Sequence, residues 1–241
     1  MQIKKEITKW LDEMEIENYV INDDLTVDVN DDVDISNMNL NFIPIKFKEI
    51  KGSFDCSYNN LKSLKGGPEK VNGYYSCKYN QLISLKKCPK EINGDFDCSN
   101  NNLTHLKGGP EKVSGNFYCE SNRLKSLKGG PKEVGENYFC QRNALKTLKG
   151  SPNQINSSFY CGHNNITFLK GCPEIIDRDF DCNSNKIISL EEGPKRVGSH
   201  YLYYNNPVRY YHYKTNIFIK LIKDIIYPFT WILKLKNKIY D

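Results

Sequence analysis

The sequence predicts an α/β repeat solenoid, because a single pattern of residues recurs every 21 positions through most of its 241 residues. Cysteine marks the period without exception. An aromatic residue stands two places before each cysteine and an asparagine three places after it. The repeated cysteines are Cys56, Cys77, Cys98, Cys119, Cys140, Cys161 and Cys182.

Four further positions complete the repeat unit. A leucine or isoleucine falls five and eight places after each cysteine, and a proline and then a valine or isoleucine follow, so that one unit reads aromatic-x-Cys-x-x-Asn-x-Leu-x-x-Leu-x-x-x-Pro-x-x-Val. The aromatic residue and the cysteine are two apart, so in a strand both side chains point to the same side. An apolar pair at every period predicts that this side faces a core.

This unit resembles the leucine-rich repeat, in particular the short form found in bacterial, phage and giant-virus proteins. The resemblance covers residues 33–211. It implies a solenoid with a parallel β-sheet on its concave face and an irregular, turn-rich convex side. It also implies a non-enzymatic scaffold that binds another protein, and in a phage or virus that protein would belong to the host.

The two ends predict caps, since an uncovered sheet edge invites aggregation. Residues 1–32 read as a helix and a hairpin, with Ile7 and Leu11 on the apolar face of the helix. Residues 33–211 form the solenoid. Residues 212–241 read as two apolar-faced helices separated by Pro228. Helical caps are therefore expected at both ends.

The cysteines are expected to be buried structural residues and not a site of chemistry. Free cysteine packs well in a tight apolar layer, where its thiol is inert. In-register cysteines on neighbouring strands would have Cβ atoms about 4.8 Å apart, too far for an unstrained disulfide. Cys161 and His163 lack a second pair of zinc ligands nearby. We expect no catalytic residue, no metal and no cofactor.

Sequence composition predicts a cytoplasmic location and argues against nucleic acid as a partner. The N-terminus lacks an apolar stretch of signal-peptide length, so we expect a cytoplasmic protein, or one in the host cytoplasm if it is viral. Residues 1–52 hold six Lys against twelve Asp or Glu, whereas the net charge of the chain is +5. This uneven distribution argues against a general nucleic-acid-binding protein.

The variable residues that point outward from the strands are the candidates for partner binding. Most are polar between the aromatic residue and the cysteine, but Tyr118, Phe139 and Tyr160 place three aromatics there in succession. Aromatic side chains are favoured anchors of interfaces. The residues predicted to contact a partner are Tyr74, Tyr79, Tyr118, Phe139, Arg142, Tyr160, His163, Leu202 and Tyr204.

Other interpretations of these surfaces stay open at this level. Stacking of the three aromatics across strands could serve sheet stability alone. A lysine recurs along one edge from Lys65 to Lys170. This row could be a solvated rim, or it could be a docking strip for an anionic surface. Residues 217–240 could lie in a membrane interface with Trp231 as an anchor. An effector-type ubiquitin ligase would need a catalytic domain larger than the residues that follow the repeats. The identity of a partner and the oligomeric state are not encoded in any recognisable motif.

Overall fold

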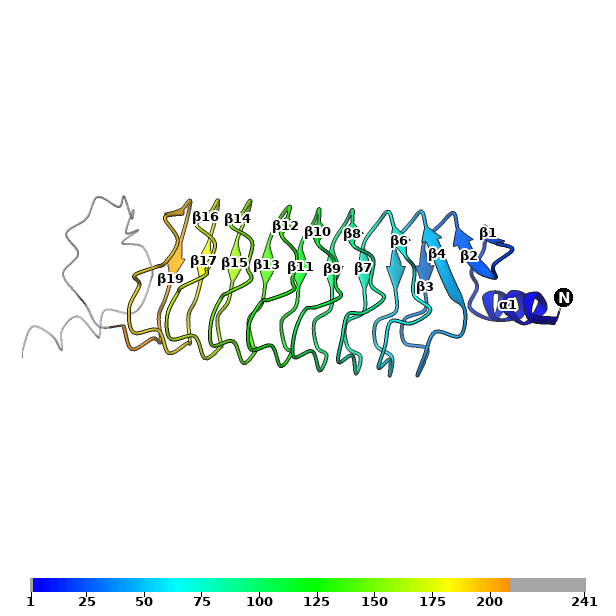
Figure 1. Ribbon diagram of the computed structural model, residues 1–241, viewed down its shortest axis with the longest axis horizontal. Coiled ribbons are helices and arrows are strands. Elements are labelled where there is room, and N and C mark those ends of the chain that lie inside the picture. The colour runs from blue at the N-terminus through cyan, green and yellow to red at the C-terminus, as the bar shows by residue number, and fades with distance from the viewer. Residues whose placement is uncertain (1, 209–241) are drawn as a thin grey trace, which may run out of the picture.

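The computed structural model describes residues 2–208, which form one elongated stack of turns with a helix at its N-terminal end (Figure 1). Helix α1 (Gln2–Glu13) buries Ile7 and Leu11. Strands β1 (Tyr19–Ile21) and β2 (Thr26–Val29) pair antiparallel, and β2 then pairs with the first strand of the solenoid behind it. The expected N-terminal helical cap is confirmed. The expected C-terminal helices lie outside the described residues.

The first side of the solenoid is a nine-stranded parallel sheet. Each strand holds the aromatic residue of one repeat and the residue that follows it, and each pairs in register with the strands one turn before and after. The strands are β3 (Val33–Asp34), β5 (Phe54–Asp55), β7 (Tyr75–Ser76), β9 (Phe96–Asp97), β11 (Phe117–Tyr118), β13 (Tyr138–Phe139), β15 (Phe159–Tyr160), β17 (Phe180–Asp181) and β19 (Tyr201–Leu202).

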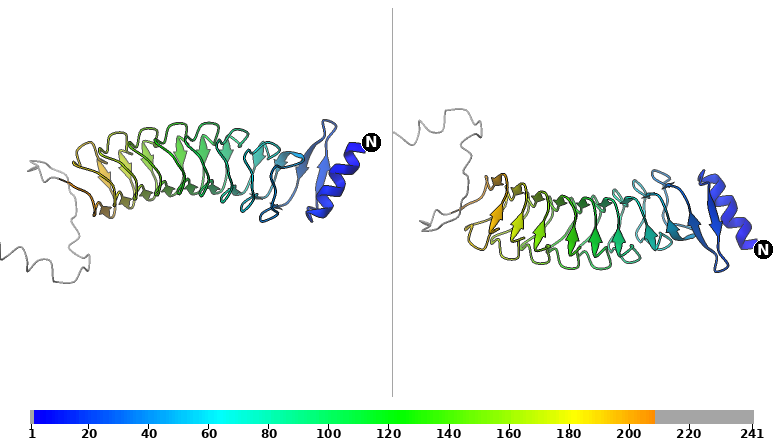
Figure 2. Two further views of the ribbon diagram at one scale, coloured as in Figure 1. Left: turned by 90° about the horizontal axis from the view of Figure 1, so that it is seen from below. Right: turned by 90° about the horizontal axis from the view of Figure 1, so that it is seen from above.

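The other side is more regular than the sequence led us to expect. In place of turns alone it carries a second row of parallel strands, built on the repeated valine or isoleucine, and Figure 2 shows the turns evenly repeated from both directions. The strands are β4 (Lys46–Ile50), β6 (Lys70–Val71), β8 (Glu91–Ile92), β10 (Lys112–Val113), β12 (Glu133–Val134), β14 (Gln154–Ile155), β16 (Ile175–Ile176) and β18 (Arg196–Val197). Of this row, β4, β6, β8, β10 and β12 continue the sheet of β1 and β2, and β14, β16 and β18 form a separate sheet.

Between the nine-stranded sheet and the second row of strands lies a core made of the repeated apolar residues, as predicted. The aromatic and cysteine of each central repeat are fully buried, as are both leucine positions. Neighbouring aromatic rings inside the core pack at mixed angles, from 20° for Phe96 on Phe117 to 79° for Phe180 on Tyr201. Burial raises the pKa of the repeated thiols well above the ordinary value for cysteine, as at Cys119 and Cys140, so these thiols stay protonated near neutral pH.

The repeated asparagine joins each turn to the one before it. Asn143 Nδ2 donates to the carbonyl oxygens of Cys119 (3.0 Å), Cys140 (3.3 Å) and Gln141 (3.3 Å), and its Oδ1 accepts from the backbone N–H of Leu124 at 3.0 Å. One amide therefore satisfies four backbone groups where two successive strands end. The same pattern recurs at each member of this asparagine ladder: Asn59, Asn80, Asn101, Asn122, Asn143, Asn164, Asn185 and Asn206.

We predict that Asn101→Ala lowers the free energy of unfolding by about 2–4 kcal/mol, because it leaves several buried backbone groups without partners. The matched control is Asn72→Ala, which removes an exposed turn asparagine and should change stability by less than about 0.5 kcal/mol. Urea denaturation followed by circular dichroism measures both. Equal effects of the two substitutions would show that the ladder contributes little.

Candidate partner-binding surface

The outward side of the nine-stranded sheet, here called the strand face, carries the variable residues of each repeat. The position between the core aromatic and the cysteine points outward in every strand, and the residue there is only partly buried in most turns. Going along the stack, this outward position holds Asp34, Asp55, Ser76, Asp97, Tyr118, Phe139, Tyr160, Asp181 and Leu202.

Three of these residues, Tyr118, Phe139 and Tyr160, form what we call the outer aromatic stack. The ring centroids of Tyr118 and Phe139 are 4.7 Å apart and those of Phe139 and Tyr160 are 4.8 Å apart, with 2° between the ring planes in both pairs. These separations match the spacing of neighbouring strands, so the backbone register imposes the stacking. The rings cover one another, so each residue is half-buried, whereas the sequence suggested an exposed stripe.

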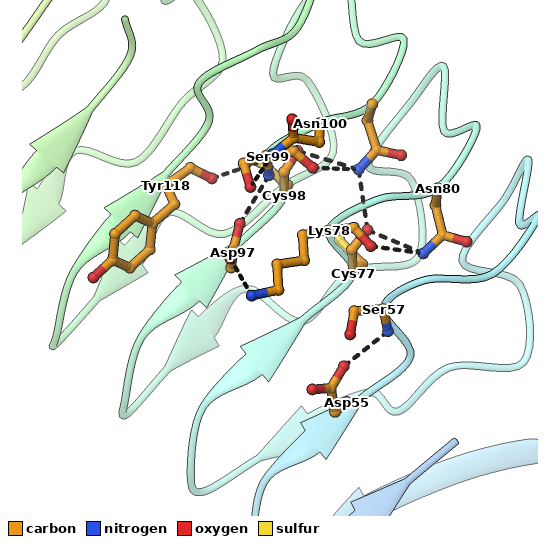
Figure 3. Close-up of polar contacts among 11 residues, drawn as sticks. Asp55, Ser57, Cys77, Lys78, Asn80, Asp97, Cys98, Ser99, Asn100 and Tyr118 are labelled. Atoms are coloured by element: carbon orange, nitrogen blue, oxygen red, sulfur yellow. Dashed lines mark hydrogen bonds and ion pairs between the residues drawn. The ribbon is translucent and has the colours of Figure 1, made fainter. Parts of the chain in front are cut away.

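Aspartate at the outward position has a local structural role that the aromatics cannot fill. The carboxylate of Asp97 accepts a hydrogen bond from the backbone N–H of Ser99 at 2.9 Å, which closes the turn after the strand (Figure 3). Asp55 and Asp181 do the same for the residues two places on. A phenylalanine ring has no acceptor, and the tyrosine hydroxyl stands at the far end of its ring, away from this N–H. The outer aromatic stack therefore replaces a turn-closing group in three successive turns.

A second unusual feature lies two residues after each cysteine, where the backbone is left-handed in every turn. The φ angles at this turn position lie between 49° and 56°. Asparagine tolerates this conformation, whereas larger side chains are strained in it by roughly 1 kcal/mol. The residues are Asn37, Tyr58, Tyr79, Asn100, Ser121, Arg142, His163, Ser184 and Asn205.

Bulky residues therefore occupy the left-handed turn position at four places, and three of them are predicted contact residues. Tyr79 stacks on Tyr58 with ring centroids 4.6 Å apart and 11° between the planes. Arg142 and His163 are exposed beside the outer aromatic stack. The structure thus brings Arg142 and His163 next to the stack, whereas Tyr79 belongs to a separate pair nearer the N-terminal end.

The remaining predicted residues lie toward the ends of the strand face. Tyr74 is 44% exposed, and burial together with the negative charges of Asp55, Asp34 and Asp32 raises the pKa of its hydroxyl. Leu202 occupies the outward position of β19 and is half-buried. Tyr204 is 52% exposed and its hydroxyl accepts a hydrogen bond from Asn183 at 3.1 Å. The structure does not gather these residues with the outer aromatic stack.

A row of acceptor oxygens beside the stack was not found by sequence reasoning. In three of the turns around the stack, a residue with a side-chain oxygen directly follows the cysteine. These residues are Glu120, Gln141 and Asn183. One side-chain oxygen of each is buried without a hydrogen-bond partner. Burial raises the pKa of the Glu120 carboxyl to about 7, its own backbone N–H lowers it, and the charge of Asp97 raises it again. We call these three residues the acceptor row.

The strand face carries an excess of negative charge. Four positions of each turn face outward here: those three and one residues before the cysteine, and those one and two residues after it. In the described turns, the Lys and Arg residues at these positions are Lys78 and Arg142. Against these two cations stand eight carboxylates: Asp32, Asp34, Asp55, Asp95, Asp97, Glu120, Asp179 and Asp181. Burial, followed by the charges of Asp95, Asp97, Glu120 and Glu136, raises the pKa of the Tyr118 hydroxyl.

The second sheet, in contrast, balances its charges. Its two outward columns alternate in sign from turn to turn between residues 48 and 133, and ion pairs join Lys90 to Glu111 and Lys112 to Glu133, both at 3.4 Å. The lysine edge consists of one exposed lysine per turn, namely Lys65, Lys86, Lys107, Lys128, Lys149 and Lys170. Its final member pairs with Glu192 at 3.5 Å. The acidic and basic surfaces therefore lie on different sides of the rod.

Neither a metal centre nor a membrane span emerges from the part of the chain that the structure covers. Among residues 2–208, no group of three or more His, Cys, Asp or Glu side chains is arranged to hold a metal ion. Within the same residues, no helix has the length and apolar character needed to span a bilayer. The interfacial helix considered for residues 217–240 lies outside the described part of the chain.

We predict that Glu120→Gln becomes progressively more stabilising as the pH rises. The folded-state pKa of about 7 exceeds the ordinary value of 4.5, so the folded chain retains a proton that the unfolded chain releases. The stability of the wild type should fall relative to the variant by about 1–2 kcal/mol between pH 4.5 and 8, allowing for partial exposure of the carboxyl. Thermal unfolding at four pH values measures this. A constant difference would contradict the prediction.

No protein-family model and no curated protein matches this chain. Among solved structures, it is similar to YopM from Yersinia enterocolitica WA-314, with 15% sequence identity and a TM-score of 0.35. The match covers 71% of this chain and 55% of that chain, so this chain spans little more than half the length of that protein.

Proposed function

We propose that the protein is a non-enzymatic scaffold that binds another protein through the strand face. The observation that carries this proposal is the outer aromatic stack. At the same position Asp55, Asp97 and Asp181 close their turns with a hydrogen bond, and three successive turns give up that bond for an aromatic ring. Half-exposed aromatic side chains are favoured interface anchors, so partner binding accounts for their presence.

Backbone conformation supports the same location. Arg142 and His163 adopt φ angles of 53° and 54°, which asparagine would adopt at a lower free-energy cost. Strained residues next to an aromatic surface are typical of sites where function outweighs stability. Together with the stack they outline a surface of about three turns in the middle of the strand face.

The chemistry of the thiols favours a scaffold over an enzyme. The seven repeated cysteines are buried, and burial holds their pKa values above the ordinary range, so none is a ready nucleophile. A bacterial, phage or giant-virus source, a host partner and a cytoplasmic location remain part of the proposal. The source and the host partner are supported by the repeat pattern.

The membrane- or anion-associating alternative has less support. It relies on the lysine edge and on residues 217–240. The lysine edge is a row of exposed side chains with a single exposed aromatic residue, Phe168, beside its last member Lys170, and such a row is typical of a solvated rim. We therefore retain partner binding through the strand face as the single proposed function.

We predict that replacing Tyr118, Phe139 and Tyr160 together by serine abolishes partner capture while the solenoid stays folded. Ser76 occupies the same outward position naturally, so serine fits the backbone there. The control is Phe168→Ser. Phe168 is 51% exposed away from the strand face, where serine stands at the same repeat position in Ser63, Ser84, Ser126 and Ser189. Cross-linked partners are identified by mass spectrometry. An unchanged set of partners for the triple variant would disprove the proposal.

We also predict that Arg142→Asn and His163→Asn each raise the free energy of unfolding by about 0.5–1 kcal/mol, because asparagine relieves the left-handed strain. Both substitutions should weaken partner capture. Arg123→Asn, at an exposed position without a positive φ, serves as the control and should change neither property. A loss of stability in both variants would show that these side chains make stabilising contacts within the chain.

A further inference from the structure

The charge distribution of the rod restricts the chemistry of a partner on the strand face. Eight carboxylates face outward there against two cationic side chains, whereas the second sheet alternates its charges and the lysine edge lies elsewhere. A partner surface that covers the strand face must compensate this negative charge, or binding leaves carboxylates desolvated without counter-charges. The complementary partner is basic, and an anionic partner such as a nucleic acid is disfavoured.

The ends of the outer aromatic stack offer two similar places for a flat cation. Tyr118 pairs in register with Asp97 on one side, and Tyr160 pairs with Asp181 on the other. Aspartate is much shorter than tyrosine, so one face of each terminal ring has no ring stacked on it from the neighbouring strand. At each end the terminal tyrosine therefore lies on the strand next to one that carries an aspartate, and Figure 3 shows Tyr118 and Asp97 on their neighbouring strands.

Several acceptor oxygens around the stack have no hydrogen-bond donor. Glu120 Oε2, Gln141 Oε1 and Asn183 Oδ1 are of this kind but are buried, so the acceptors open to a partner are the partly exposed carboxylates of Asp97 and Asp181. At the Tyr118 end the nearest cation is Lys78, whose Nζ lies 3.8 Å from Asp97 Oδ2 in a long contact. An arginine guanidinium has five N–H donors and a flat face. It can stack on an aromatic ring and donate to a carboxylate at the same time, which a lysine ammonium cannot do.

We propose that the strand face binds a basic, arginine-containing polypeptide segment, with one arginine on the free face of Tyr118 beside Asp97 and Glu120 and another on the free face of Tyr160 beside Asp181. This inference rests on the proposed function and names the class of partner for the same surface. The segment runs along the rod, across the strands, with the outer aromatic stack beneath its central residues.

The geometry also sets the spacing of the two arginines. Asp97 and Asp181 lie on strands β9 and β17, four strand steps apart. Four steps of about 4.8 Å give about 19 Å, and an extended chain advances about 3.3 Å per residue, so the arginines lie about six residues apart. An even spacing also places both side chains on the same side of an extended segment.

The test measures binding of fluorescein-labelled peptides to the full chain by fluorescence anisotropy at pH 7.5. The probe is a nine-residue Gly/Ser peptide with two arginines six positions apart. Three further peptides carry two adjacent arginines, two lysines six apart, or two glutamates six apart. We expect the spaced arginine peptide to bind most tightly, the other basic peptides several-fold more weakly, and the glutamate peptide not at all.

Two variants of the full chain locate the binding. Asp97→Asn with Asp181→Asn removes both charges but keeps a side-chain oxygen for the backbone N–H groups of Ser99 and Asn183, so the turns stay closed. This double variant should bind the spaced peptide about tenfold more weakly. Equal binding by wild type and double variant, or equal binding of the spaced and adjacent arginine peptides, would overturn the inference.

The two proposals fail in different ways. If the triple serine variant loses its cross-linked partners but the double asparagine variant keeps them, the strand face binds a protein whose chemistry is not basic, and only the present inference is wrong. If both variants lose the spaced peptide but keep every cross-linked partner, the strand face is a cation-binding surface, and the proposed function is wrong.

Discussion

Every feature of this rod depends on one constraint, which is that successive turns stack in register at the spacing of β-strands. The asparagine ladder enforces this register, because each amide bonds the backbone of its own turn and of the turn before. A residue at a given repeat position is therefore always next to the residues 21 places away. The residue types that suit a repeat position are therefore those that pack or form hydrogen bonds with the same residue type in the neighbouring turns.

Different positions meet this constraint in different ways. In the core, each cysteine, leucine and aromatic residue packs against its counterparts in the neighbouring turns, which is favourable for apolar groups. On the second sheet, where like charges would repel at about 4.8 Å, lysine and glutamate alternate from turn to turn, and Lys112 meets Glu133. On the strand face, repeated carboxylates are tolerated because many of them also accept backbone hydrogen bonds, as Asp97 does. This face therefore carries charge that the fold itself does not neutralise.

The sequence was sufficient to predict the features that repeat. The 21-residue period predicted the stack and the inward aromatic and cysteine. It did not reveal the second parallel sheet, because strands of two residues such as Lys112–Val113 are too short to show alternation. The left-handed turn position was also missed, although its frequent Asn and Ser were a usable signal. Unpartnered oxygens such as Glu120 Oε2 depend on three-dimensional packing and had no signal in the sequence.

The outward position shows most clearly how structure changes the interpretation of a repeat. From sequence, Asp55 and its counterparts looked like solvated polar residues, and the aromatic turns looked like an exposed stripe. The structure shows that aspartate there closes its own turn with a hydrogen bond. Each aromatic residue therefore replaces a stabilising group. The same turns hold Arg142 and His163 in a strained backbone conformation. Two independent departures from the commonest repeat thus coincide within three turns. Ring stacking across the strands offsets part of the loss of the turn-closing hydrogen bonds. Arg142 and His163, in contrast, hold a backbone conformation that asparagine would adopt at a lower free-energy cost, which is the reason for placing the proposed partner contact on these turns.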